Sequence, residues 1–238
     1  MYNDITHNKR RTWLLIAAMS VIIVGLSALI GGMNGADPGP SIIVGTMFAS
    51  VYSLISYYAS ASVALTVSGA KRIEKAQAPD LYNLVENLCI ANGQPMPAVY
   101  IIDDASPNAF ATGRDPEHAS VAFTTGILKL LTREELEGVV AHELSHVKNY
   151  DIRVMTIVVV LVGLISLIAD IMIHMRFRGN EKNGAGIALV LIGIALAILS
   201  PIFAKIIQLA VSRSREYLAD ASGALLTRYP EGLARALE

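Results

Sequence analysis

The sequence has little charge and almost no cysteine. Of its 238 residues, 16% are charged, whereas a soluble domain has about 25%. The lone cysteine, Cys89, excludes an internal disulfide and is typical of a reducing compartment. The formal net charge of -1 argues against a nucleic-acid partner, because binding to phosphates requires a basic excess that this chain lacks. The hydrophobic share of 53% instead indicates a chain in contact with a lipid bilayer.

Two uncharged runs near the N-terminus predict a transmembrane hairpin over residues 1–70. Residues 13–32 supply the roughly 20 apolar residues with which a helix crosses a bilayer. A turn-rich stretch, residues 34–40, separates them from a second run at 41–70. A cleaved secretory signal is the alternative for the first run, because Lys and Arg precede it, but a signal core is shorter.

Basic residues flank the outer ends of this hairpin, and the turn between the runs has none. The positive-inside rule therefore places the N-terminus and the region after Lys71 in the cytoplasm. Residues 71–153 have the mixed composition of a folded cytosolic domain. A helix is expected from Pro79 until Gly93 ends it, and strands are expected at 98–102 and 120–124. The segment 108–113 is either an edge strand or a loop.

A second hydrophobic region, residues 154–204, is predicted as another transmembrane hairpin. Its second run, 184–204, is long enough to span. The first run, 154–169, is short and crosses only if Asp170 is tolerated or the bilayer thins. The alternative is a hairpin that is buried against the domain or lies in the interface. If both runs cross the membrane, or if neither does, residues 205–238 lie on the same side of the membrane as the cytosolic domain.

The motif His142-Glu143-Leu144-Ser145-His146 carries the chemistry. Thr132 and Glu135 form a capping-box pattern, which predicts a helix from Thr132 toward Tyr150. Histidines four residues apart share one helical face and can both reach one ion, which is half of a zinc site. Glu143 lies in the middle of an apolar stripe, where a carboxylate needs a compensating partner such as a cation with its water.

A catalytic zinc site needs a third protein ligand. No other histidine follows at a suitable spacing, so an acidic ligand is favoured, and Glu216 is the best candidate. Glu216 and Asp220 share one face of a predicted helix, on which Asp220 would orient a ligand histidine by a hydrogen bond. The alternative is a solvated acidic face that pairs with neighbouring arginines. Tyr217 is a weaker candidate for stabilising an oxyanion, since such a tyrosine more often packs.

With both motifs in place, the sequence resembles the HtpX-type membrane zinc metalloproteases, which are related to the prenyl-protein endopeptidases and the mitochondrial stress protease. The resemblance covers nearly the whole chain and includes Asn149 and Asp151 after the motif. It implies an endopeptidase of the bacterial inner membrane that cleaves damaged or misassembled membrane proteins from the cytosolic side. Family members usually continue past the position of Glu238 with a late His-Pro segment, so a further segment is expected.

The expected fold is therefore mainly α with a small β-sheet, in which multi-spanning membrane helices join a zincin-like metalloprotease domain. One Zn²⁺ per chain would be held by His142, His146 and Glu216, with Glu143 as the catalytic base. The resemblance also implies that the segment 108–113 borders the substrate cleft, where an extended peptide could add to a strand edge. An ordinary turn is the alternative for that segment. The predicted substrate-binding residues are Asn108, Ala109, Phe110 and Ala111.

Two other functions stay open at this point. A prenyl-protein processing endopeptidase has the same motif pair but more membrane spans than can be identified in this sequence. A non-catalytic membrane scaffold is the second, but it would not explain why the carboxylate of Glu143 lies on an apolar face. Asp170 and His174 could form a polar site within the membrane, which would suggest transport, but both stand at the end of a run, where an interfacial position is expected.

Overall fold

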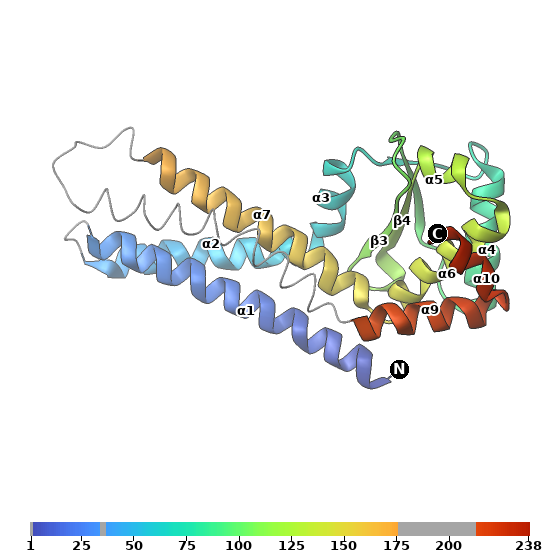
Figure 1. Cartoon of the computed structure of the whole chain (residues 1–238). Coiled ribbons are helices and arrows are strands. Elements are labelled where there is room, and N and C mark those ends of the chain that lie inside the picture. The colour runs from blue at the N-terminus through green and yellow to red at the C-terminus, as the bar shows by residue number, and fades with distance from the viewer. Residues whose placement is uncertain (1, 34–36, 176–212) are drawn as a thin grey trace. The chain divides into compact units, whose positions relative to one another are not determined.

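The computed structural model describes residues 2–33, 37–175 and 213–238 (Figure 1). These residues fall into two compact units. The first consists of residues 2–10, 60–156 and 213–238, and the second of residues 11–59 and 157–175. The predicted apolar run at 184–204 lies outside the described residues.

The second unit is built from long apolar helices. Its core contains Ile16, Met19 and Ile23, with partners from two other helices, Ala49, Ile157 and Leu164. The side chains of Val44 and Met47 are each 66% exposed, which suits a hydrocarbon solvent. Three helices of the described residues are long and apolar enough to cross a membrane, which agrees with a membrane-spanning chain. These helices are α1 (Tyr2–Met33), α2 (Pro38–Tyr58) and α7 (Asp151–Met175).

The second uncharged run does not form one continuous helix. Helix α2 ends at Tyr58, and a short helix, α3 (Ser60–Val67), follows after Ala59. Twenty-one residues of α2 at about 1.5 Å each still cover about 30 Å of hydrocarbon. No proline or glycine stands at this break, so the sequence pattern did not indicate it.

A four-stranded sheet organises the first unit. Its order is β1-β2-β4-β3, in which β2 and β4 are parallel and the other pairs are antiparallel. The segment expected as an edge strand or a loop is the edge strand β3. A 3-10 helix, Pro116–His118, connects it to β4. The strands are β1 (Lys71–Arg72), β2 (Ala98–Ile102), β3 (Ala109–Gly113) and β4 (Ala119–Thr124).

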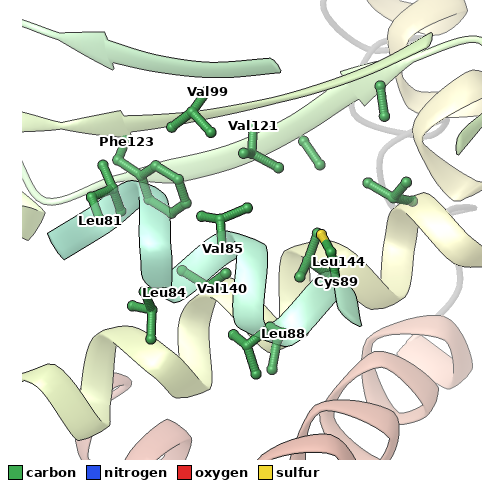
Figure 2. Packing of buried hydrophobic residues seen from close by; sticks show 14 of the residues in the cluster. Leu81, Leu84, Val85, Leu88, Cys89, Val99, Val121, Phe123, Val140 and Leu144 are labelled. Carbon is green, nitrogen blue, oxygen red and sulfur yellow. The ribbon is translucent and has the colours of Figure 1, made fainter. Parts of the chain in front are cut away.

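Helix α4 (Pro79–Asn92) shares one hydrophobic core with the sheet and with the helix that carries the His-Glu-x-x-His motif (Figure 2). It begins at a proline and ends at Gly93, whose φ of 63° is left-handed, as the sequence predicts. Its buried side chains meet Val121 and Phe123 of the sheet and Val140 and Leu144 of the motif helix. The apolar side chains of the motif helix thereby pack in this core. The histidines of the helix lie near Glu216.

The motif helix is α6 (Arg133–Lys148) and begins with the predicted capping box between Thr132 and Glu135. Helices α9 (Arg213–Thr227) and α10 (Pro230–Ala236) pack against it, and α5 (Thr125–Leu130) follows β4. The approach of α10 is close at Gly138, because a Cβ there would lie 2.6 Å from the backbone nitrogen of Leu233. Glycine at this position therefore permits the contact between α6 and α10.

We predict that Gly138→Ala lowers the free energy of unfolding by about 1–3 kcal/mol, the usual cost of overpacking. The added methyl meets backbone atoms of Leu233, which can move only with their helix. The thermal unfolding midpoint of the purified chain in detergent measures this change. The control is Gly25→Ala, which places a methyl in open space and should leave the midpoint unchanged or slightly raised. An unchanged midpoint for Gly138→Ala would contradict the close packing.

Candidate metal centre

The two motif histidines lie one turn apart on α6 and face the same point. The Nε2 atoms of His142 and His146 are 3.1 Å apart, and their rings are almost perpendicular, at 82°. Two ring nitrogens at this distance cannot both present a lone pair to each other without a proton or a cation between them. The α-helical spacing therefore produces the pair of converging donors that the sequence predicts.

Glu216 of α9 completes the group. Its Oε2 lies 3.5 Å from Nε2 of His142 and 3.8 Å from Nε2 of His146. The approach of α9 to α6 depends on small residues, since Ala219 is fully buried and a Cβ at Gly223 would lie 3.2 Å from the backbone nitrogen of His142. The structure thus brings together the three side chains that the sequence predicts as ligands.

Each histidine has a carboxylate at its other ring nitrogen. Asp220, which the sequence predicts to orient a ligand histidine, has its Oδ1 2.9 Å from Nδ1 of His142. Asp151 Oδ2 lies 3.2 Å from Nδ1 of His146. The sequence pattern alone did not predict a role for Asp151. Its position in the sequence, five residues after His146 and at the start of the next helix, could have indicated a carboxylate within reach of that histidine.

The two histidines differ in their affinity for a proton. Burial, together with the positive charge of His146, lowers the pKa of His142. Burial also acts to lower the pKa of His146, but hydrogen bonds to Asp151 and Glu216 outweigh it and raise this pKa to about 10. The hydrogen bond from His146 lowers the pKa of the Glu216 carboxyl. The three groups together therefore attract one positive charge to the point on which they converge.

The side chain of Glu143 lies beside this group and has a different environment. Burial raises the pKa of its carboxyl to about 7, although the charge on His146 and a hydrogen bond from the backbone N–H of Ala111 both lower it. Ala111 belongs to the edge strand β3, so the sheet orients this carboxylate. A carboxyl group whose pKa is close to neutral can exchange protons at physiological pH.

The segment predicted to bind substrate forms the outer edge of the sheet. The backbone N–H of Thr124 donates to the carbonyl of Asn108 at 3.0 Å. Because pairing alternates along an antiparallel ladder, the backbone groups of Phe110 face β4, and those of Ala109 and Ala111 face away from it. The edge next to the motif helix therefore presents the backbone of Ala109 and Ala111, whereas the backbone of Phe110 pairs within the sheet.

Tyr217 and His118 have different surroundings from the residues of this group. The side chain of Tyr217 is 68% exposed, in keeping with its position on α9 beside Glu216. The Nδ1 atom of His118 lies 2.6 Å from Oδ1 of Asp115, within its own loop, and His118 takes no part in the group formed by the other histidines.

Known proteins match this chain over its full length. The sequence of residues 75–238 matches Peptidase family M48. A "Protease HtpX homolog" of Tropheryma whipplei is 48% identical over 238 residues, which cover 100% of this chain and 81% of that protein. Proteins with the same description from Lactobacillus acidophilus and Streptococcus gordonii are 45% and 40% identical, and each match covers 100% of this chain and 83% of the relative.

A solved structure, described as the crystal structure of S. mikatae Ste24p, has a similar fold. The match has a TM-score of 0.50 and 22% identity, and covers 98% of this chain and 58% of that one. It bears out a mainly helical fold with a small sheet. The sequence matches, the helices long enough to cross a membrane and the group of His142, His146 and Glu216 agree with one another. The chain belongs to peptidase family M48, as a membrane metalloprotease of the HtpX type.

Proposed function

We propose that this chain is a zinc endopeptidase of the bacterial inner membrane that hydrolyses peptide bonds of damaged or misassembled membrane proteins. The observation that carries the proposal is the convergence of two imidazoles and one carboxylate beside a second, partly buried carboxylate, Glu143. Spanning helices in the same chain support substrates that are themselves in the membrane.

The distances within the group fit zinc. Ligand atoms arranged tetrahedrally at about 2.0–2.1 Å from Zn²⁺ are about 3.3 Å from one another, and the three observed separations are 3.1, 3.5 and 3.8 Å. Two histidines and one glutamate also form the ligand set of a known class of catalytic zinc sites. Each such site holds one zinc ion. The chemistry that a bound zinc ion supplies is Lewis acidity, which polarises the scissile carbonyl and makes water more acidic.

Glu143 is the proposed catalytic base. Its carboxylate takes a proton from the attacking water and delivers it to the amine that leaves the cleaved peptide bond. The hydrogen bond from Ala111 keeps the carboxylate next to the edge strand. Asp220 and Asp151 hold Nδ1 of the two histidines, so each Nε2 is presented as a ligand atom.

An extended substrate segment can bind by adding to the outer edge of β3. The N–H and C=O of Ala109 and the C=O of Ala111 face away from β4 and can pair with a peptide in the manner of an additional strand. Because Ala111 also contacts Glu143, a peptide bound at this edge lies close to the catalytic base. We propose Asn108, Ala109, Phe110 and Ala111 as the substrate-binding segment.

The charges at the ends of the helices support a cytosolic active site. Three basic residues, Lys9, Arg10 and Arg11, stand in the first turns of α1, and three others follow α3, at Lys71, Arg72 and Lys75. By the positive-inside rule both ends of this hairpin lie in the cytoplasm. The catalytic region, proposed as residues 71–153 with 205–238, would therefore face the cytosol between the hairpins at 1–70 and 154–204.

We predict that Glu143→Gln retains its zinc but loses cleavage. The amide cannot accept the proton of water, which should lower the rate constant for cleavage about 10²–10⁴-fold. The three ligands are unchanged, so zinc bound per chain should equal that of the wild type. Both quantities are measured on the full chain reconstituted in liposomes with a misfolded membrane protein as substrate, and mass spectrometry of the products distinguishes general cleavage from prenyl-protein processing.

The matched control for this test is Glu137→Gln, which makes the same chemical change in the same helix. This variant should keep both zinc and cleavage. Cleavage by Glu143→Gln at the wild-type rate would contradict the role of Glu143 as the base.

We also predict that Ala109→Pro weakens substrate binding. Proline removes an N–H that faces away from β4, so the pairs within the sheet are kept while one bond to a substrate strand is lost. The KM for a polypeptide should rise several-fold, by about the contribution of one hydrogen bond. Ala109→Ser keeps the N–H and should retain the wild-type KM. An unchanged KM for Ala109→Pro would show that substrates bind elsewhere.

A further inference from the structure

The N-terminal segment that precedes the first hydrophobic run contributes a buried polar side chain next to the metal centre. Asn8 is 1% exposed, whereas its neighbours His7 and Lys9 are exposed. Such burial of an amide has an unfavourable free energy unless its donors are satisfied. The position of Asn8 therefore calls for a specific set of partners, and the structure supplies them at the junction of α6 and α7.

The amide nitrogen of Asn8 faces two acceptors. Nδ2 donates to the backbone carbonyl of Asn149 at 2.9 Å and to Oδ1 of Asp151 at 2.7 Å. Two acceptors at one end of the side chain identify that end as the NH₂ group. Both bonds fall on the turn that directly follows the second motif histidine.

This turn has an unusual backbone. Tyr150, between the two acceptor residues, has a φ of 60°, which is unfavourable for a residue with a side chain. Its ring lies below two cations, with Lys9 Nζ at 4.5 Å and Arg153 Cζ at 5.2 Å from the ring centroid. Asn8 and Lys9 together thus hold a turn that would otherwise relax and move Asp151.

Asp151 connects this turn to the metal centre. Its side chain is 2% exposed. Oδ1 accepts from Asn8 and lies 3.3 Å from Nη1 of Arg215, and Oδ2 lies 3.2 Å from Nδ1 of His146. A carboxylate oxygen beside Nδ1 accepts the hydrogen bond of an N–H at that atom and so directs Nε2 of the imidazole toward a metal.

We propose that Asn8 is a positioning residue of the metal centre, which acts through Asp151 to fix the orientation and tautomer of His146. The first turns of α1 then serve the active site as well as preceding a membrane span. This inference rests on the proposed zinc site. The partners of a ligand histidine typically affect metal affinity about 10–100-fold, which sets the size of the expected effect.

The test measures the affinity of the full-length chain for Zn²⁺ in detergent, by competition with a chromophoric chelator. Asn8→Ala should bind Zn²⁺ about 10–100-fold more weakly than the wild type. The neighbouring variant His7→Ala, which changes an exposed side chain in the same turn, should bind Zn²⁺ as tightly as the wild type. The visible absorption of the Co²⁺-loaded protein should also change for Asn8→Ala, because the geometry at His146 is altered.

A double-mutant cycle separates positioning from general stability. If Asn8 acts through Asp151, Asn8→Ala should weaken Zn²⁺ binding much less when Asp151→Asn is already present. Effects that simply add would overturn the proposal, as would wild-type affinity and an unchanged Co²⁺ spectrum for Asn8→Ala.

Two further measurements keep the result decisive. If Asn8→Ala does not fold, Asn8→Asp keeps the size of the side chain but replaces the donor, and the same loss of affinity is expected. Wild-type affinity in Asn8→Asp would then overturn the inference. A wild-type chain that binds no Zn²⁺ would instead refute the proposed zinc site itself, so the two failures are distinguishable.

Discussion

The candidate metal centre depends on the close packing of two helices, α6 and α9, that are far apart in the sequence. The histidines on α6 are preorganised by their spacing, but two ligands do not make a catalytic zinc site. The proposed third ligand, Glu216, comes close to them because Ala219 and Gly223 allow α9 to approach α6. The core of the first unit fixes the opposite side of α6, through Val140 and Leu144 against α4 (Figure 2). The apolar core therefore determines where the ligands stand.

Electrostatics explains why such an arrangement favours a cation. Four carboxylates gather around the two histidines, and the cationic partner described for them is the guanidinium of Arg215. The excess of negative charge attracts a proton to His146, whose pKa rises to about 10, and burial raises the pKa of Glu143 to about 7. A divalent ion placed among the same groups would neutralise the excess and favour the ionised form of Glu143. The same side chains would therefore both bind the proposed metal ion and keep the proposed base, Glu143, ionised. The carboxylates are Glu143, Asp151, Glu216 and Asp220.

Short sequence motifs correctly predicted those features of the structure, such as helix ends, that depend on residues close together in the chain. The capping box at Thr132 and the left-handed Gly93 mark helix ends through contacts within one turn, and both are confirmed. The convergence of Glu216 on the histidines was predicted from chemistry, since a third ligand was required and an acidic face was available. The partnership of Asn8 with Asp151 could not be predicted, because it joins residues 143 positions apart through packing that has no periodic signal. The break at Ala59 was missed for a related reason, since no residue there disfavours a helix.

The central claim is that one zinc ion binds to His142, His146 and Glu216. X-ray absorption at the zinc edge, recorded on the purified wild-type chain and on Glu216→Ala, tests it most directly. We expect one zinc per wild-type chain, with two imidazole ligands and carboxylate oxygen in its coordination shell. We also expect a large loss of zinc, or of that oxygen, in Glu216→Ala. Zinc of the same stoichiometry and the same ligand shell in both proteins would contradict the account.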